Sequence, residues 1–412
     1  MQSFFGEVLM KVMMLTYGFD PCPQSSSQRV SSFAQAMVQS GFEVTVITAG
    51  RCLMKKRRHS SRQLFRVYDL KCSRFIISLS NLIINPLLVL LFSFMAIPLL
   101  LRRRVDVILA SVPYGEVAVA GFFLSKMFGV PLVIDMRDLY PSLPELSLTY
   151  LRLPRRVSEI LTSLFLIVYK SSSKIVCVDS YIKEKLEGLG IAPQKIFIVP
   201  NGADVSIHKP CKPNHREKIR LKYGLPLDSV IVVYAGSLTR YYPVIEAIKG
   251  VKTLLPEVNN LQLLIISYSD SAFYRSLTKN LGLEEIVRFT GPLSISETAR
   301  VLSACDVGIV VYSGEDYWKG TYGSKIFSYM ACGLPILASG PSGSVINKLI
   351  DEHQLGFFIG SPNEKSFAKG FSFFLNNRSA LEGMGKKGVR VVRKCYDRRV
   401  LGLKLVALLK AN

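Results

Sequence analysis

The chain has 412 residues, 49% of them hydrophobic, which favours two folded domains with large apolar cores. Its 52 Lys and Arg residues outnumber its 30 Asp and Glu residues, so the net charge of +22 predicts an anionic partner. Eight cysteines without paired spacing or a CxxC motif favour a reducing compartment over a disulfide scaffold. Cys177, Cys305 and Cys332 lie in apolar runs, which is typical of buried thiols in a reducing compartment.

The N-terminal residues do not predict a signal peptide. Glu7 and Lys11 interrupt them, and no basic region precedes the apolar residues. Residues 8–16 predict a first buried strand instead, with its clearest part at 11–16.

The segment 82–101 is uncharged, is followed by three arginines and is long enough to span a bilayer. However, residues 8–48 and 105–135 resemble parts of one sheet domain, and Pro86 and Pro98 interrupt the run. We therefore expect a helix or helix pair packed on the core, able to dip into one leaflet, and keep a true span as the less favoured alternative.

The first half alternates between strand and helix patterns. Strands are expected at 11–16, 43–48, 105–110, 131–134, 174–178 and 196–199, and helices at 28–39, 117–127, 157–169 and 181–187. Strands separated by helices predict parallel βαβ units in a doubly wound sheet.

A break at Pro200-Asn201-Gly202 and a polar linker at 206–217 precede a second alternation. Strands are expected at 229–234, 261–267, 286–289, 307–311, 336–338 and 356–359, and helices at 244–255, 273–281, 294–304, 365–375 and 378–410, with one more between Ser324 and Gly333. The predicted fold is α/β with two doubly wound Rossmann-like domains facing across a cleft. Their boundaries are 1–204 and 205–385, and a C-terminal helix, 386–412, crosses back to the first domain.

Two segments of the second half predict an anion site. The strand at 229–234 runs into Gly236-Ser237 and then Arg240, and Ser324 is predicted to cap a helix that carries Lys325 in its first turn. A cation there opposes the helix dipole unless an anion binds. Because ligands bind at the carboxyl ends of strands, these groups are expected to converge on a diphosphate. Plain turns and solvated side chains are the alternative, also for Gly291, a turn candidate near a base or ribose.

The order of the motifs resembles the GT-B glycosyltransferases, in particular the large retaining family 4. The resemblance covers nearly the whole chain and is carried by KVMMLTYGFDPCPQSS, VIDMRDLYP, IFIVPNGAD, YAGSLTRY, RFTGPLS and GSKIFSYMACGLPILAS. It implies a nucleotide-sugar donor bound by the second domain and an acceptor bound by the first. It implies neither a metal nor another cofactor, since cations stabilise the leaving diphosphate.

The resemblance also implies roles for individual residues. Arg240 and Lys325 stand at the family's basic positions, and Gly236, Ser237, Gly291, Ser324 and Ser328 complete the expected donor site. Ser328 and Gly320 replace two glutamates of the family; Glu315 and Asp316 are candidate substitutes.

The acceptor side is expected at Gln24, Ser25 and Arg29, where Gln24-Ser25 replaces a paired glycine of the family and Arg29 matches it. Asp135, Arg137 and Asp138 follow a buried strand. Arg137 lies near a position where many members carry a histidine, and Asp138 is the candidate that orients the acceptor hydroxyl or takes its proton. A structural Asp–Arg pair is the alternative.

Basic residues cluster in the first domain and the tail, at 55–58, 102–104, 155–156, 386–387 and 398–399, and many of them flank the two most apolar helices. This predicts a cytoplasmic enzyme, peripheral on an anionic membrane face, that uses a lipid-linked or polysaccharide-precursor acceptor. A merely basic, soluble protein is the alternative, and nucleic acid is not favoured. The expected activity is a metal-independent, retaining hexosyltransferase. A catalytically degenerate relative that serves as a membrane-associated binding or scaffold subunit is the other function kept open.

Overall fold

The computed structural model describes residues 10–19, 25–51, 65–70, 86–112, 115–138, 155–239, 242–255 and 260–411. The chain forms two compact units, Met1–Pro200 together with Arg399–Asn412, and Asn201–Arg398. The return to the first unit thus lies later in the chain than the expected residue 386.

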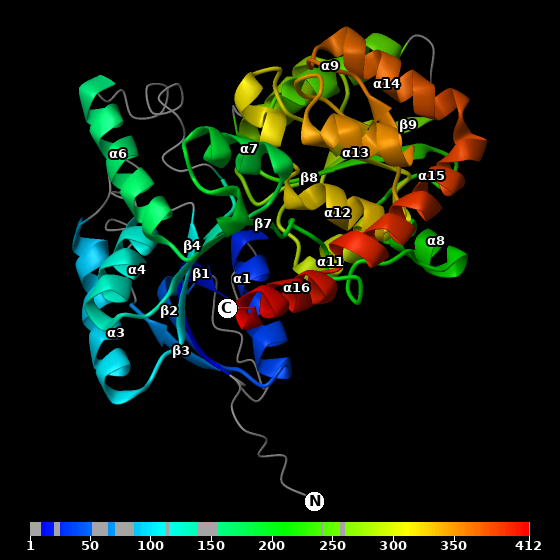
Figure 1. Ribbon diagram of the computed structural model, residues 1–412. Coiled ribbons are helices and arrows are strands. Elements are labelled where there is room, and N and C mark those ends of the chain that lie inside the picture. Colours follow the sequence, from blue (N-terminus) through cyan, green and yellow to red (C-terminus); the bar gives the residue numbers. More distant parts are fainter. Residues whose placement is uncertain are drawn as a thin grey trace, which may run out of the picture. The chain divides into compact units, whose positions relative to one another are not determined.

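The first unit contains a seven-stranded parallel sheet with the order β3-β2-β1-β4-β5-β6-β7 (Figure 1). Leu15 of the central strand lies beside Ile47 on one neighbour and Ala110 on the other. The strands are β1 (Lys11–Phe19), β2 (Glu43–Arg51), β3 (Arg66–Asp69), β4 (Val107–Val112), β5 (Leu132–Met136), β6 (Lys174–Cys177) and β7 (Ile196–Ile198).

Helices cover both faces of this sheet. The helices are α1 (Ser25–Gln39), α3 (Pro86–Arg102), α4 (Gly115–Phe128), α6 (Arg155–Ser171), α7 (Ser180–Gly188) and α16 (Arg398–Lys410). The core on one face is filled from α3, α4 and α6, and the core on the other from α1 and α16. A Cβ on Gly402 of α16 would lie 2.5 Å from Ala36 Cβ, so a glycine lets the C-terminal helix pack closely on α1.

The second unit repeats this topology in a six-stranded parallel sheet with the order β10-β9-β8-β11-β12-β13. Its strands are β8 (Val230–Ala235), β9 (Leu261–Ile266), β10 (Val287–Phe289), β11 (Val307–Val310), β12 (Ile336–Ala338) and β13 (Gly356–Phe358). Its helices are α8 (Pro213–Lys222), α9 (Val244–Leu254), α10 (Ala272–Asn280), α11 (Ile295–Ala304), α12 (Ser324–Ala331), α13 (Val345–His353), α14 (Glu364–Asn376) and α15 (Arg378–Val391).

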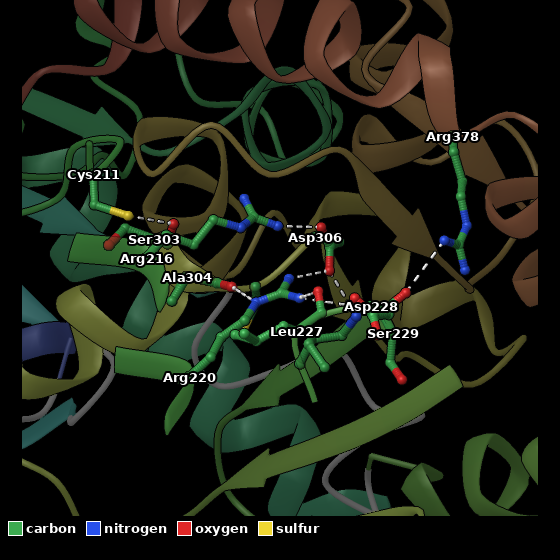
Figure 2. A network of polar contacts seen from close by, with 12 residues as sticks. Cys211, Arg216, Arg220, Leu227, Asp228, Ser229, Ser303, Ala304, Asp306 and Arg378 are labelled. Atoms are coloured by element: carbon green, nitrogen blue, oxygen red, sulfur yellow. Dashed lines mark hydrogen bonds and ion pairs between the residues drawn. The ribbon is translucent and has the colours of Figure 1, made fainter. Parts of the chain in front are cut away.

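The strands β8 and β11 are held together at their amino ends by a buried polar network (Figure 2). The Arg220 side chain is buried, donates to Asp306 at 2.6 Å and also donates to the carbonyls of Ala304, Leu227 and Ser229. Asp306 in turn accepts from the backbone N–H of Ile231 on β8. The network therefore fixes the two strands at which the strand order reverses, and ligands of such sheets bind at the opposite, carboxyl ends.

The α/β fold with two doubly wound sheets is confirmed, with local differences. The predicted linker contains α8, which begins at Pro213, a residue favoured in a first helical turn. The strand β3 and the helix α13 were not predicted. The predicted helix 378–410 is interrupted by a π-helical turn, Val392–Tyr396, and by Asp397, which pairs with Ala203 in an isolated bridge.

The apolar segment 82–101 is described from Pro86 onward, where it forms α3. Leu88, Phe92 and Ala96 of this helix are fully buried in the core of the first unit, as expected for a helix packed on the sheet. None of the helices in the described ranges combines the length and the apolar character needed to cross a bilayer.

Candidate functional site

The site begins at the carboxyl end of β8, where the chain passes through Gly236 and Ser237. The hydroxyl of the buried Tyr234 donates to the Ser237 carbonyl at 2.7 Å, and Gly236 N–H donates to the carbonyl of Ile266 on β9. A Cβ on Gly236 would lie 2.7 Å from Lys325 Nζ. The predicted glycine therefore lies where the end of a lysine side chain comes close to the backbone.

The second part of the site is the N-terminus of α12. Gly323 precedes the helix with φ of 61°, and a Cβ at this residue would lie 2.1 Å from the Tyr312 hydroxyl. Gly323, not Ser324, is the N-cap; Ser324 is the first helical residue, so the predicted cap was one residue too late. The first turn carries no acidic side chain, which leaves its backbone N–H groups and the helix dipole available to an anion.

Two contacts fix α12 against the sheet. The Tyr329 hydroxyl accepts a hydrogen bond from Ala235 N–H at the end of β8. The Tyr329 ring also lies over Gly308 of β11, where a Cβ would approach ring atoms to 2.5 Å. These contacts hold α12 against β8 and β11, and the close approach of Gly323 to the Tyr312 hydroxyl places the helix N-terminus just past the carboxyl end of β11.

Lys325 lies among aromatic rings at this point. Its Nζ is 4.3 Å from the Tyr234 ring centre and 4.6 Å from that of Tyr242, and it donates to the Tyr234 hydroxyl at 3.2 Å. Among the residues that the structure describes, no carboxylate forms an ion pair with Lys325. Burial lowers the pKa of Lys325 to about 7, because its charged form loses hydration without gaining a counter-charge.

The sequence did not predict the aromatic cluster next to Lys325, which consists of Tyr242, Tyr312 and Trp318. Tyr242 contacts Tyr312 and Trp318, whose rings stack at 4.5 Å, and Trp318 Nε1 donates to Ser313 Oγ. The signals were available: Trp318 is the single tryptophan of the chain, and Tyr312 directly follows an apolar strand.

The structure connects the other residues predicted for the nucleotide-sugar site less directly to Lys325. Ser328 is three residues after Lys325, on the same face of α12, and is half-buried. Gly291 follows β10 with φ of 73°, as expected for a turn, but no contact joins it to Lys325. Arg240 lies outside the described residues, so its predicted approach to Lys325 stays a prediction.

The loop before α12 holds the residues considered as substitutes for the missing glutamates. Gly320 is buried, and Glu315 and Asp316 are exposed. Asp316 pairs with Lys319 at 3.0 Å, and Glu315 accepts from Ser313. No contact in the described chain joins either carboxylate to Lys325.

In the first unit, Asp135 and Arg29 form a buried ion pair. Asp135 on β5 accepts from Arg29 Nη2 at 2.9 Å and from Ser111 Oγ at 2.9 Å. Arg29 also donates to the carbonyls of Val199 and Pro200. The predicted alternative was a structural Asp–Arg pair that caps the turn at Asp138. The pair found here joins Asp135 to Arg29 and leaves that alternative a prediction. These contacts favour a structural role for Arg29 over the predicted acceptor contact.

The other first-unit candidates lie at or near the same carboxyl edge. Arg137 is half-buried and donates through Nε to the Val112 carbonyl at 2.9 Å, and Asp138 next to it is exposed. Gln24 lies outside the described residues. Ser25 is the first residue of α1, and its side chain lies outside what is described. Among the described residues, no group of three or more His, Cys, Asp or Glu is arranged to hold a metal ion.

Family comparisons match both units. The glycosyltransferase family 4 model matches residues 26–207, and the model of glycosyl transferases group 1 matches residues 215–391. Among characterised relatives, the D-inositol 3-phosphate glycosyltransferase of Corynebacterium glutamicum is 26% identical over 209 residues, 49% of this chain and 48% of that protein. The chain thus matches about half the length of such relatives.

Solved structures resemble nearly the whole chain. Sucrose-phosphate synthase from Thermosynechococcus elongatus has a TM-score of 0.74 at 15% identity, covering 97% of this chain and 98% of its own. The Anabaena HepE complex with UDP has a TM-score of 0.74 at 15% identity, covering 98% and 100%. WaaG, a glycosyltransferase involved in lipopolysaccharide biosynthesis, has a TM-score of 0.69 at 14% identity, covering 97% and 100%. The two family-model matches identify the chain as a member of glycosyltransferase family 4, and its two sheets together with these structural neighbours give it the GT-B fold.

Proposed function

We propose that the protein transfers a sugar from a nucleoside-diphosphate sugar to an acceptor with retention of configuration. The observation that carries this proposal is Lys325, a cation without a carboxylate partner in the described chain, at the start of α12. A diphosphate placed there would meet the Lys325 ammonium, the N–H groups of the first helical turn and the close backbone of Gly236.

In the proposed reaction, the bond between the sugar and the diphosphate breaks and a bond to the acceptor oxygen forms on the same face of the sugar. Negative charge develops on the departing diphosphate, and Lys325 together with Arg240 stabilises it. Arg137 and Asp138 are proposed to act on the acceptor side, with Asp138 taking the proton of the acceptor hydroxyl. Ser328 is proposed to donate one hydrogen bond to the donor.

For the donor, uridine diphosphate sugars are the first choice, since HepE, a relative in fold, was solved with UDP and with UDP-glucose. For the acceptor, we propose a lipid-linked sugar or a polysaccharide precursor at the cytoplasmic face of an anionic membrane. The net charge of +22 and the free, buried thiols of Cys177, Cys305 and Cys332 support this choice.

A non-catalytic binding or scaffold role is the second candidate. It is favoured by Ser328 and Gly320, which stand where the family carries glutamates. A serine donates or accepts one neutral hydrogen bond, whereas a carboxylate forms charge-assisted bonds that are roughly twice as strong. Donor affinity, and turnover with it, would therefore be reduced in this chain.

Titration calorimetry with a panel of uridine and guanosine diphosphate sugars tests the proposal. Binding of at least one donor is expected, and Lys325→Ala and Arg240→Ala are each expected to weaken it by about 1.5 kcal/mol or more, the contribution of a hydrogen bond to a charged group. Lys348→Ala, which removes an exposed lysine from α13, is the matched control and should leave affinity unchanged. A folded protein that binds no donor would instead favour the scaffold role.

A further inference from the structure

Helix α3 exposes a continuous apolar stripe. Leu87, Leu90, Phe94 and Leu101 are 46%, 66%, 79% and 72% exposed. Their spacing places them on one face of the helix, opposite the face that is buried against the sheet. An amphipathic surface helix would carry polar residues on that outer face, so the stripe calls for an apolar partner.

The neighbouring helices continue this surface. α3 packs on α4, and α4 packs on α6 (Figure 1). α4 adds two exposed apolar residues and α6 adds three, each set at helical spacing: Phe123 and Met127, then Ile160, Leu164 and Ile167. Within the described chain, nine of the sixteen large exposed apolar residues lie on these three helices. We call this surface the α3–α4–α6 face.

A basic rim borders the face. Each of the three helices leads to the amino end of the next parallel strand, β4, β5 or β6, and these strands are neighbours in the sheet. The helix C-termini therefore lie along the same edge of the sheet. They carry the exposed cations Arg102, Arg104, Lys126 and Lys170. The acidic groups nearby are fewer: Asp106 lies 3.9 Å from Arg104, Glu43 pairs with Arg103 at 2.7 Å, and Glu159 is exposed on α6.

We propose that the α3–α4–α6 face docks on the surface of an anionic bilayer. Apolar side chains would enter the boundary between headgroups and acyl chains, and the basic rim would meet the anionic headgroups. Charge complementarity favours a bilayer over a second copy of this chain, because an anionic surface attracts the basic rim whereas a second copy would bring its own net charge of +22 to the contact. The inference names a surface for the proposed lipid-linked acceptor and in that respect rests on the proposed function.

The docked arrangement leaves the catalytic candidates of the first unit uncovered. The rim lies at the amino edge of the sheet, whereas Arg137 and Asp138 follow the carboxyl end of β5. The face also runs along the helices and not across the ends of the strands. A lipid-linked acceptor could therefore leave the bilayer beside the face and reach the carboxyl edge.

Flotation of the full-length protein with vesicles tests the proposal at low salt, where surface electrostatics are least screened. Vesicles of phosphatidylcholine alone are compared with an equimolar mixture of phosphatidylcholine and phosphatidylglycerol. Binding is expected to the mixture and to fall with added salt. Phe94→Glu should weaken it about tenfold or more, because an anionic group replaces a large apolar one at the contact. Phe273→Glu, at a phenylalanine that is 63% exposed in the second unit, is the matched control and should bind as the wild type does.

A second variant tests the rim independently of the apolar stripe. Arg102→Ala with Lys126→Ala should weaken binding to the mixed vesicles about thirtyfold, since each cation contributes about 1 kcal/mol near an anionic surface. Wild-type protein that stays at the bottom of the gradient overturns the proposal. So does equal binding by Phe94→Glu, or a dimer that Phe94→Glu dissociates without any vesicle binding. Calorimetry with UDP, measured on the same Phe94→Glu protein, reports separately on the donor site and distinguishes failure here from failure of the proposed function.

Discussion

Binding of a nucleoside diphosphate should depend on the charge of Lys325 and therefore on pH. In the ligand-free protein, burial lowers the pKa of this lysine to about 7 from its ordinary value of 10.5. A bound diphosphate supplies the missing counter-charge and should return the pKa toward the ordinary value. The diphosphate therefore binds the protonated form, and affinity should fall as pH rises through about 7.

The size of this change in affinity follows from the two pKa values of Lys325, about 7 without ligand and 10.5 with its charge compensated. The protonated fraction of the free lysine is about one half at pH 7 and about one hundredth at about pH 9, whereas the bound lysine stays protonated. Affinity for UDP should therefore fall about fiftyfold over this interval, or about 2.3 kcal/mol. At about pH 8, binding should take up about 0.9 proton.

Calorimetry in buffers of different ionisation enthalpy measures both quantities. A phosphate monoester loses its second proton near pH 6, so the titration of UDP itself contributes little above pH 7. Lys325→Arg is the control: its guanidinium stays charged, so any affinity that it retains should not change between pH 7 and about pH 9. Affinity of the wild type that is constant over this range, with no proton uptake, would refute the placement of Lys325 at the diphosphate.

Three further substitutions test the structure around the sites. Arg220→Ala should lower the free energy of unfolding by about 1–3 kcal/mol in urea titrations, because it leaves the carbonyls of Ala304, Leu227 and Ser229 without their buried donor; a change below about 0.5 kcal/mol contradicts this. Gly236→Ala should weaken UDP binding in calorimetry, since the new Cβ would displace Lys325 Nζ; unchanged affinity would contradict the close approach. Asp135→Ala should destabilise the first unit by about 3–5 kcal/mol, because it removes the carboxylate that compensates the buried charge of Arg29; a protein as stable as the wild type would contradict a structural role for the pair.

The sequence predicted the sheets well because buried parallel strands are short apolar runs that few other elements share. It missed β3, whose four residues, Arg66–Asp69, are only partly buried at the sheet edge and show no apolar run. It mistook α8 for a linker because Ile219 and Leu221 are the only aliphatic residues of that helix and form no apolar face at helical spacing. Arg220 anchors α8 through contacts with residues far along the chain, and a local pattern cannot show these. The helix α13 was readable, since Val345, Ile346, Leu349 and Ile350 have helical spacing after Ser344.

At the donor site, the sequence located Gly236 and Lys325 because both follow strands that the topology brings together. It did not predict what surrounds the lysine. Tyr234 lies inside a strand, where an aromatic residue is ordinary, and Tyr242, Tyr312 and Trp318 come from separate segments. Because these side chains come together only after folding, their positions in the sequence show no regular spacing that could reveal the site. The same reason explains why Asp135 was considered with Arg137, its near neighbour in sequence, and not with Arg29.

The aromatic residues around Lys325 do not neutralise its charge. A carboxylate beside the lysine would neutralise it and compete with an incoming anion, whereas a ring face attracts the ammonium only weakly. The lysine therefore keeps an uncompensated charge at the price of a less stable ligand-free fold. Its folded pKa of about 7 lies below the unfolded value, so this destabilisation is fully present below pH 7 and is relieved as pH rises toward 10.5. Lys325→Met should accordingly raise the melting temperature of the ligand-free protein at pH 7 while it removes the stabilisation that UDP gives the wild type. At neutral pH, a bound diphosphate would relieve this destabilisation by supplying the missing counter-charge, and this is the physical basis of the proposed donor specificity.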